Sequence, residues 1–158
     1  MKVCIVYDSK RGSTERVARA MEMALRERGF EARAWNAGQD PDVDDCDLVV
    51  IGAPIYYERP LPGIGRFIAS KNGLKGKKVA VFILCIADRF GKLGRRYTER
   101  RYLRMMTEPI EGRIIAARVF DGWILGENEG TIDEARGWIM RVVEAFEDGR
   151  GLGIEHPG

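Results

Sequence analysis

The sequence alternates short apolar runs with longer stretches of helical periodicity, and it does so five times. The apolar runs cover residues 2–7, 31–36, 47–53, 77–85 and 113–120. Continuous apolar runs are typical of strands buried on both faces, whereas 31–36 alternates as an outer strand does. Parallel strands need crossover connections, and right-handed crossovers place helices on both faces of a sheet. The pattern therefore predicts an open, doubly wound α/β domain.

The intervening segments carry helix signals. Ser13 is a favourable N-cap for the first helix, and Thr131 with Glu134 forms a capping box for the last one, which Gly149 ends. Helical patterns also cover 61–70 and 92–106. No linker divides the chain, so we expect one domain over residues 1–149 and a flexible tail over residues 150–158, which contains the only histidine, His156.

The loop after the first predicted strand reads Ser-Lys-Arg-Gly-Ser-Thr, residues 9–14. It combines hydroxyl donors and two cations with a glycine that gives the backbone freedom. The helix that follows adds unpaired backbone N–H groups and the positive end of its dipole. This combination is typical of an anion site, and a terminal phosphate dianion fits it without a metal.

Ligands of such sheets bind beyond the carboxyl ends of the strands, where the strand order reverses. The loops predicted at this edge are 8–13, 53–60 and 86–92. The second loop follows Gly52-Ala53-Pro54 and has the aromatic residues Tyr56 and Tyr57. These rings offer a flat apolar wall to a planar ligand.

These motifs resemble the flavodoxin family, whose phosphate loop reads roughly T/S-x-T-G-x-T and whose third strand leads through Gly-Ser/Ala-Pro to an aromatic residue. The resemblance implies a flavodoxin-like, five-stranded parallel sheet of order 2-1-3-4-5 with FMN as cofactor. Two features depart from the family pattern. Arg11 stands where a hydroxyl is usual, and the third loop lacks the acidic, tyrosine-bearing pattern of electron-carrying flavodoxins.

The resemblance assigns the cofactor site residue by residue. Loop 9–14 is expected to hold the FMN phosphate. The isoalloxazine ring is expected to stack on Tyr56, Tyr57 or Phe90, with backbone groups of Ala53 and Pro54 at its edge. The expected cofactor-binding set is Ser9, Lys10, Arg11, Gly12, Ser13, Thr14, Ala53, Pro54, Ile55, Tyr56, Tyr57, Ala87, Asp88, Arg89, Phe90 and Gly91. No catalytic residue is assigned.

A basic segment follows the third loop. Residues 89–104 contain seven cations and one acid, Glu99, although the whole chain has a net charge of only +2. A solvated helix normally intersperses acids, so the segment predicts a surface for an acidic redox partner, an anionic substrate or an anionic membrane face. The small total charge argues against nucleic acid. An Arg-rich solvated face without a partner is the alternative reading.

Three functional classes stay open: an electron carrier, an oxidoreductase resembling the flavodoxin-type protoporphyrinogen oxidases, and a flavin-free interaction module. Other chemistries are excluded by spacing. A receiver domain needs an acidic pair where Asp8 stands alone, and no P-loop motif is present. The cysteines Cys4, Cys46 and Cys85 lie far apart, which predicts neither a disulfide framework nor a zinc site. Without a span-length apolar run or a secretory signal, the expected location is the cytoplasm.

Overall fold

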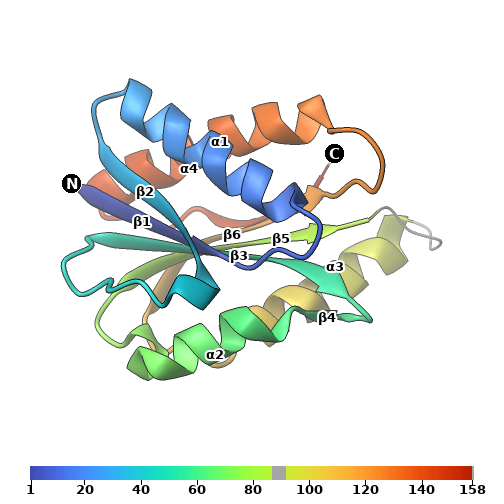
Figure 1. The fold of residues 1–158 in the computed structure, drawn as a ribbon, viewed down its shortest axis with the longest axis horizontal. Coiled ribbons are helices and arrows are strands. Elements are labelled where there is room, and N and C mark those ends of the chain that lie inside the picture. The colour runs from blue at the N-terminus through green and yellow to red at the C-terminus, as the bar shows by residue number, and fades with distance from the viewer. Residues whose placement is uncertain (87–91, 158) are drawn as a thin grey trace.

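A parallel β-sheet runs through the middle of the computed structural model, which describes residues 1–86 and 92–157 (Figure 1). Its central strands lie in the order β2-β1-β3-β5-β6. Their bounds are β1 (Lys2–Tyr7), β2 (Glu31–Asn36), β3 (Leu48–Tyr56), β5 (Lys78–Cys85) and β6 (Arg113–Asp121). In order of sequence this is the predicted 2-1-3-4-5 topology, and the predicted flavodoxin-like α/β fold is confirmed.

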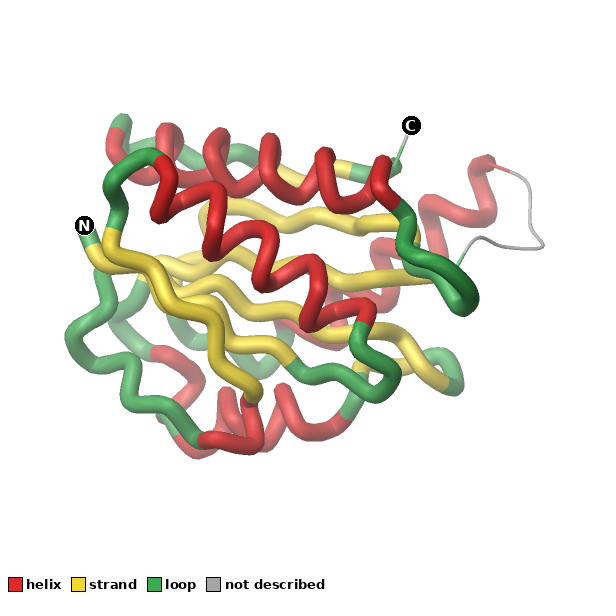
Figure 2. The backbone as a smooth tube through the Cα atoms, turned by 45° about the horizontal axis from the view of Figure 1, so that its top comes forward, coloured by secondary structure: helices red, strands yellow, loops and turns green. Residues whose placement is uncertain are grey.

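Helices cover both faces of the sheet (Figures 1 and 2). The helices α1 (Ser13–Glu27) and α4 (Glu129–Glu147) lie side by side on one face, and α2 (Pro62–Ser70) and α3 (Lys92–Thr107) lie on the other. Two 3-10 turns, η1 (Ala37–Gln39) and η2 (Asn72–Leu74), connect elements on the α2 side. The sheet therefore separates two hydrophobic layers, one under each pair of helices.

The layer under α1 and α4 is built around three aromatic rings. Phe82, Phe120 and Trp138 pack edge to face with ring centroids 5.7 to 6.3 Å apart. A Cβ atom at Gly52 would lie 1.9 Å from Cζ of Phe82. Glycine is thus required in the middle of the central strand β3, where the aromatic cluster approaches the backbone.

The two predicted helix caps are wrong. Gly12, with a φ of 98°, takes the N-cap position of α1, and no side chain caps that helix. For α4 the cap is Asn128, whose side chain accepts a hydrogen bond from the Thr131 backbone N–H. Thr131 lies inside the first turn, where its hydroxyl donates to the Asp121 carbonyl at 2.7 Å. The predicted cap Ser13 lies one residue after the observed cap Gly12, and the predicted cap Thr131 lies three residues after Asn128. Each helix begins earlier because a left-handed glycine or an asparagine side chain is available there.

The end of the chain also differs from the predicted flexible tail. Gly153–Glu155 form the short strand β7, which pairs parallel to β6 at the edge of the sheet. Glu155 accepts hydrogen bonds from Arg118 at 2.8 Å and from Arg141 at 2.7 Å. His156 follows and places Nδ1 2.7 Å from the buried carboxylate of Glu99. Partners distant in sequence hold this segment, so local composition did not reveal it.

The cysteine prediction is wrong as well. Cys4 of β1 and Cys46, which precedes β3, form a disulfide across 42 residues of sequence. In the parallel register of β1 with β3, Cys4 pairs with Val49. Cys46 comes three residues before Val49, so the disulfide lies where the start of β3 runs beside β1. Both cysteines are buried in the layer under α2 and α3. Cys85, at the end of β5, is also buried.

A further strand, β4 (Arg59–Pro60), turns back antiparallel on the end of β3. β3 thus continues three residues beyond the predicted end at residue 53 and forms one arm of a hairpin at the carboxyl edge of the sheet. This hairpin and the loop after β1 lie at the same edge, where the strand order reverses.

Candidate functional site

The loop between β1 and α1 is ordered by its own polar groups. The Gly12 N–H donates to Oγ of Ser9 at 3.0 Å, and the Asp8 N–H donates to the Gly52 carbonyl at 3.0 Å. The first bond closes the loop, and the second fixes its start beside the middle of β3. Gly12 needs its left-handed conformation to turn the backbone into the helix, so the glycine of the predicted motif has a clear geometric role.

The first turn of α1 has the donors that an anion requires. The backbone N–H groups of Ser13, Thr14 and Glu15 lie where a helix has no internal acceptors. The Thr14 side chain is fully buried, yet its Oγ1 has no hydrogen-bond partner within the described residues. A buried hydroxyl without a partner costs free energy unless something supplies an acceptor. These groups fit a phosphate at the start of α1.

The cations of the loop are differently placed. Lys10 and Arg11 are exposed, and Lys10 Nζ lies 5.2 Å from the ring centroid of Tyr56 and 6.0 Å from that of Tyr57. Cation–π contact therefore links the first loop to the second. Arg11, which replaces the usual hydroxyl, has no contact with another residue of the described chain that would divert it from an anion.

Asp8 is the acid nearest to this loop in sequence. A Cβ atom added at Gly63 would lie 2.4 Å from its Oδ2, so the carboxylate lies against the first turn of α2. There the positive end of the α2 dipole stabilises the negative charge. The Asp8 carboxylate therefore interacts with the start of α2, which reduces its repulsion of an anion bound at the start of α1.

The β3–β4 hairpin forms the second wall of the site. Ala53 and Pro54 are buried, Ile55 and Tyr56 are half-buried, and Tyr57 is 89% exposed. Tyr57 and Glu58 form the turn with φ values of 50° and 61°, a conformation that side chains other than glycine adopt at a cost. The Leu61 N–H donates to the Pro54 carbonyl at 3.2 Å and closes the hairpin. The structure therefore presents two tyrosines beside loop 9–14.

The third predicted loop is only partly described. Ala87, Asp88, Arg89, Phe90 and Gly91 lie outside the described residues, so their assignment to the flavin stays a prediction. Ile86, just before them, is 53% exposed and lies 3.6 Å from the position of a Cβ atom at Gly122.

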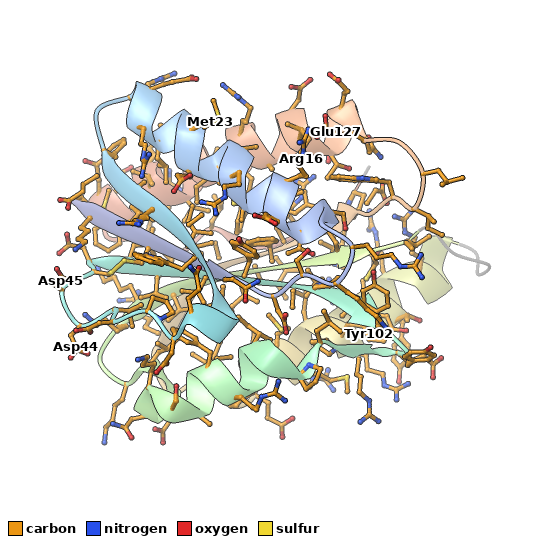
Figure 3. The ribbon with its side chains drawn as sticks, viewed as in Figure 1. Arg16, Met23, Asp44, Asp45, Tyr102 and Glu127 are labelled. Atoms are coloured by element: carbon orange, nitrogen blue, oxygen red, sulfur yellow. A yellow bond between two sulfur atoms is a disulfide. The ribbon has the colours of Figure 1, made fainter. Side chains whose placement is uncertain are left out.

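A fourth segment at this edge was missed by sequence reasoning. Residues 122–128 connect β6 to α4, and this loop exposes Ile124 and Leu125. Glu127 accepts a hydrogen bond from Nε of Arg16 at 2.7 Å, which ties the loop to the first turn of α1 (Figure 3). The apolar run Trp-Ile-Leu directly after the fifth predicted strand was the signal that could have identified it, because it falls at the same carboxyl edge.

The basic segment is not uniform. Arg95 donates to Glu99 at 2.8 Å and also pairs with Asp121. Burial disfavours the charge of Arg95, but these two carboxylates outweigh it and raise the pKa of the guanidinium. Glu99, only 3% exposed, also contacts His156. Within the predicted partner surface, Arg95 and Glu99 are therefore occupied by contacts inside the protein.

Comparison with known proteins identifies the family. The family model described as a flavodoxin domain matches residues 4–130. The chain belongs to the flavodoxin family. A flavodoxin of Clostridium saccharobutylicum is 32% identical over 87 residues, which are 52% of this chain and 54% of that protein. A coenzyme F420H2 oxidase of Methanothermobacter thermautotrophicus is 27% identical over 103 residues, 59% of this chain and 26% of that protein.

Solved structures show the same fold. The rubredoxin:oxygen oxidoreductase of Desulfovibrio gigas superposes with a TM-score of 0.70 at 17% identity, covering 93% of this flavodoxin chain and 36% of that chain. A short-chain flavodoxin associated with a bacterial microcompartment gives 0.68 at 19% identity, covering 92% and 98%. The chain spans between 20% and 54% of the length of the curated relatives.

Family membership confirms several expectations. Flavodoxins bind FMN, so the predicted cofactor is confirmed. Of the helices that the structure describes, none is long and apolar enough to cross a bilayer. The residue assignments, the partner at the basic segment and the likeness to protoporphyrinogen oxidases stay predictions.

Proposed function

We propose that this flavodoxin holds the FMN phosphate in loop 9–14 at the start of α1 and exchanges electrons with an acidic redox partner or an anionic substrate that approaches over the 89–104 segment. The observation that carries the proposal is the fully buried hydroxyl of Thr14 in the first turn of α1, which has no hydrogen-bond partner among the described residues. A phosphate oxygen would supply the missing acceptor, while the Ser13 and Glu15 N–H groups would donate to its neighbours. A cytoplasmic location is part of the same proposal.

The ring site follows from the hairpin. Tyr56 and Tyr57 lie next to Lys10, so a ring attached to a phosphate at α1 would meet aromatic side chains beside it. Bound FMN supplies the reversible reduction and oxidation of its isoalloxazine ring. The chain's own residues bind the phosphate, provide the aromatic wall and hold the hairpin closed through the Leu61 N–H bond.

Electron transfer is favoured over a flavin-free interaction module. Three of the relatives are named coenzyme F420H2 oxidases, and a fourth is a flavodoxin. An interaction module also has no need for an unpaired hydroxyl buried at a helix start. Among the described acids of these loops, Asp8 lies against the start of α2 and Glu58 is exposed in the hairpin turn, and we assign no catalytic residue.

The phosphate assignment is tested by comparing FMN, riboflavin and FAD on the purified protein by flavin fluorescence quenching. FMN should bind best, because riboflavin lacks the phosphate and the loop lacks the glycine fingerprint that admits a pyrophosphate. Equal affinity for riboflavin and FMN would contradict the assignment.

The Thr14→Val variant isolates the hydroxyl, since valine keeps the shape of threonine. FMN binding should weaken by about 1 to 3 kcal/mol, the range for a hydrogen bond to a charged group. The apoprotein should unfold no more easily than the parent, because the hydroxyl has no partner to lose. Ser13→Ala should weaken FMN by a similar amount. Thr107→Val, at the far end of α3, is the control and should leave FMN affinity unchanged.

A further inference from the structure

β2 forms one outer edge of the sheet (Figure 2) and, within the described residues, pairs only with β1. It has six residues, whereas β7 at the other end of the sheet order has three. The unpaired N–H and C=O groups of an edge strand can pair with a strand of another molecule, and a very short edge strand offers few of them. The larger risk of strand pairing between molecules therefore lies at β2.

The backbone groups on the outer side of β2 are bonded to side chains of α1. Nε of Arg26 donates to the Ala32 carbonyl at 2.7 Å, and Nη1 of Arg19 donates to the Ala34 carbonyl at 3.2 Å. Between these two bonds, the Ala34 N–H donates to Oε2 of Glu22 at 2.6 Å. Three successive groups that a further strand would use are thus occupied by α1.

The three side chains come from one stripe of α1, which we call the edge guard. Arg19, Glu22 and Arg26 are spaced by three and four residues, so they lie on the same face of the helix. Along β2 they meet an acceptor, a donor and an acceptor, and they present a donor, an acceptor and a donor in return. A neighbouring strand would present the same sequence of groups. The edge guard therefore takes the place of a neighbouring strand.

Glu22 holds the edge guard together. The residue is only 7% exposed, although a carboxylate is rarely buried unless it is paired. Its Oε1 lies 3.5 Å from Nη1 of Arg19, and its Oε2 lies 3.5 Å from Nη2 of Arg26. These contacts fix both arginines near the carbonyl groups that they bond. Removal of the Glu22 carboxylate would therefore loosen the cover over all three backbone groups.

The other face of β2 leaves space beside the edge. Arg33 and Trp35 alternate with the buried alanines and lie on that face, where the Arg33 guanidinium is 3.9 Å from the ring centroid of Trp35. A cavity of about 320 Å³ adjoins them and is also lined by Arg26 and Ala32. Hydrogen bonds from the edge guard, more than dense packing, therefore cover this edge.

We infer that Arg19, Glu22 and Arg26 hold the outer edge of β2 closed against strand pairing with a second copy of this chain. A second copy is the partner that fits, because two copies of one edge strand can pair antiparallel about a two-fold axis, each supplying the groups that the other lacks. The edge guard is separate from the proposed phosphate site, which involves only the first turn of α1.

The test compares self-association of Glu22→Ala with that of a matched variant, Glu22→Gln. Glutamine keeps a side-chain oxygen that can accept from the Ala34 N–H, whereas alanine leaves this N–H without an acceptor. In size-exclusion chromatography with light scattering, Glu22→Ala should shift from monomer to dimer as its concentration rises from about 10 to 500 µM. The parent and Glu22→Gln should stay monomeric over the same range.

Hydrogen exchange at the Ala34 amide reports on the edge itself. In dilute Glu22→Ala this amide should exchange at least roughly tenfold faster than in the parent, because a hydrogen bond to a charged acceptor is lost. At high concentration the exchange should slow again, because the second copy supplies a carbonyl. Glu27→Ala is the control, since it removes a carboxylate of the same helix that bonds Arg136 of α4. It should stay monomeric and keep the exchange rate of the parent.

A second variant removes the cations and keeps the carboxylate. Arg19→Ala combined with Arg26→Ala should fold, because both arginines are exposed and alanine favours a helix. Without these cations the Glu22 carboxylate should turn to solvent, since an unpaired buried charge is costly. The edge then opens, and the same dimer should form.

Circular dichroism and FMN binding identify the folded samples. A folded Glu22→Ala variant that stays monomeric up to about 500 µM would overturn the inference. If Glu22→Ala does not fold, a monomeric double arginine variant would overturn it in the same way. Association without renewed protection of the Ala34 amide would assign the contact to another surface and would also overturn it. Loss of FMN binding by the parent counts against the proposed function alone.

Discussion

The two helical layers of this flavodoxin use their arginines differently. In the layer of α1 and α4 the arginines meet carboxylates of the same layer. Arg136 of α4 reaches Glu27 of α1 at 3.1 Å, and Arg16 of α1 reaches Glu127 before α4 (Figure 3). In the layer of α2 and α3, the partly buried Arg95 pairs with Glu99. The exposed arginines of α3 form no ion pair within the described residues; they are Arg96, Arg100, Arg101 and Arg104.

This difference indicates which charges serve the fold and which are available to other molecules. A cation with an internal carboxylate partner gains little from an external one, because the pair is already formed. A group of like cations without partners repels itself and attracts anions from solution. We therefore call the layer of α1 and α4 the closed layer, because its arginines are paired with carboxylates. We call the layer of α2 and α3 the open layer, because its exposed arginines form no ion pair within the described residues.

The largest effect should come from the covalent link within the open layer. Replacing Cys4 and Cys46 by alanine should lower the free energy of unfolding by about 3 to 4 kcal/mol, since the disulfide closes a long loop in the unfolded chain. Urea unfolding measures this, and the parent unfolded under a reducing dithiol should match the variant. A double variant as stable as the oxidised parent would show that the disulfide contributes nothing.

The next effect tests the internal ion pair of the open layer. Glu99→Ala removes the buried carboxylate that Arg95 and the half-buried His156 share, which should cost about 3 kcal/mol of unfolding free energy. Glu108→Ala, at an exposed position directly after α3, is the control and should change stability by less than about 0.5 kcal/mol. If both variants lose the same amount, the Glu99 network is no more than a surface contact.

A smaller effect compares the two layers directly. Arg136→Gln in the closed layer should lose up to about 1 kcal/mol at low salt, and the loss should fade as salt screens the pair with Glu27. Arg100→Gln in the open layer should instead raise stability by about 0.5 kcal/mol, because it removes repulsion from Arg96 and Arg104. Equal losses in the two variants would contradict the distinction between the layers.

The smallest effect concerns two tyrosines. Burial raises the pKa of the Tyr102 phenol in the open layer, and the carboxylate of Glu58 raises it further. Burial likewise raises the pKa of Tyr7 in the closed layer, where nearby Arg19 opposes the shift. At neutral pH both phenols are protonated in the folded and in the unfolded chain. Above about pH 10 the unfolded chain loses these protons before the folded chain does, so the free energy of unfolding declines as the pH rises. Urea midpoints between about pH 9 and 11 should decline less in Tyr102→Phe and in Tyr7→Phe than in the parent.

The geometry of loop 9–14 could be predicted because it is local. Ser9, Gly12 and Thr14 lie within six residues, and the loop they form is defined by short-range bonds and by the start of the following helix. The helix caps were misplaced within this same region, since Gly12 and Asn128 compete with hydroxyl residues for the cap and local sequence does not decide between them. The loop at 122–128 was missed because Arg16 and Glu127 lie more than a hundred residues apart in sequence.

The sequence by itself determined the alternation of strands and helices, the order of the five central strands through family resemblance, and the hydroxyl-rich turn before the first helix, whose phosphate stays a prediction. These features depend on periodicity and on neighbours in sequence, which a single chain displays directly. Only the tertiary structure decided that Cys4 pairs with Cys46, that His156 reaches Glu99, and that β7 completes the edge of the sheet. It also decided which arginines are paired. The physical reason is that each of these contacts joins residues far apart in sequence, and composition does not report which distant partner the fold brings within reach.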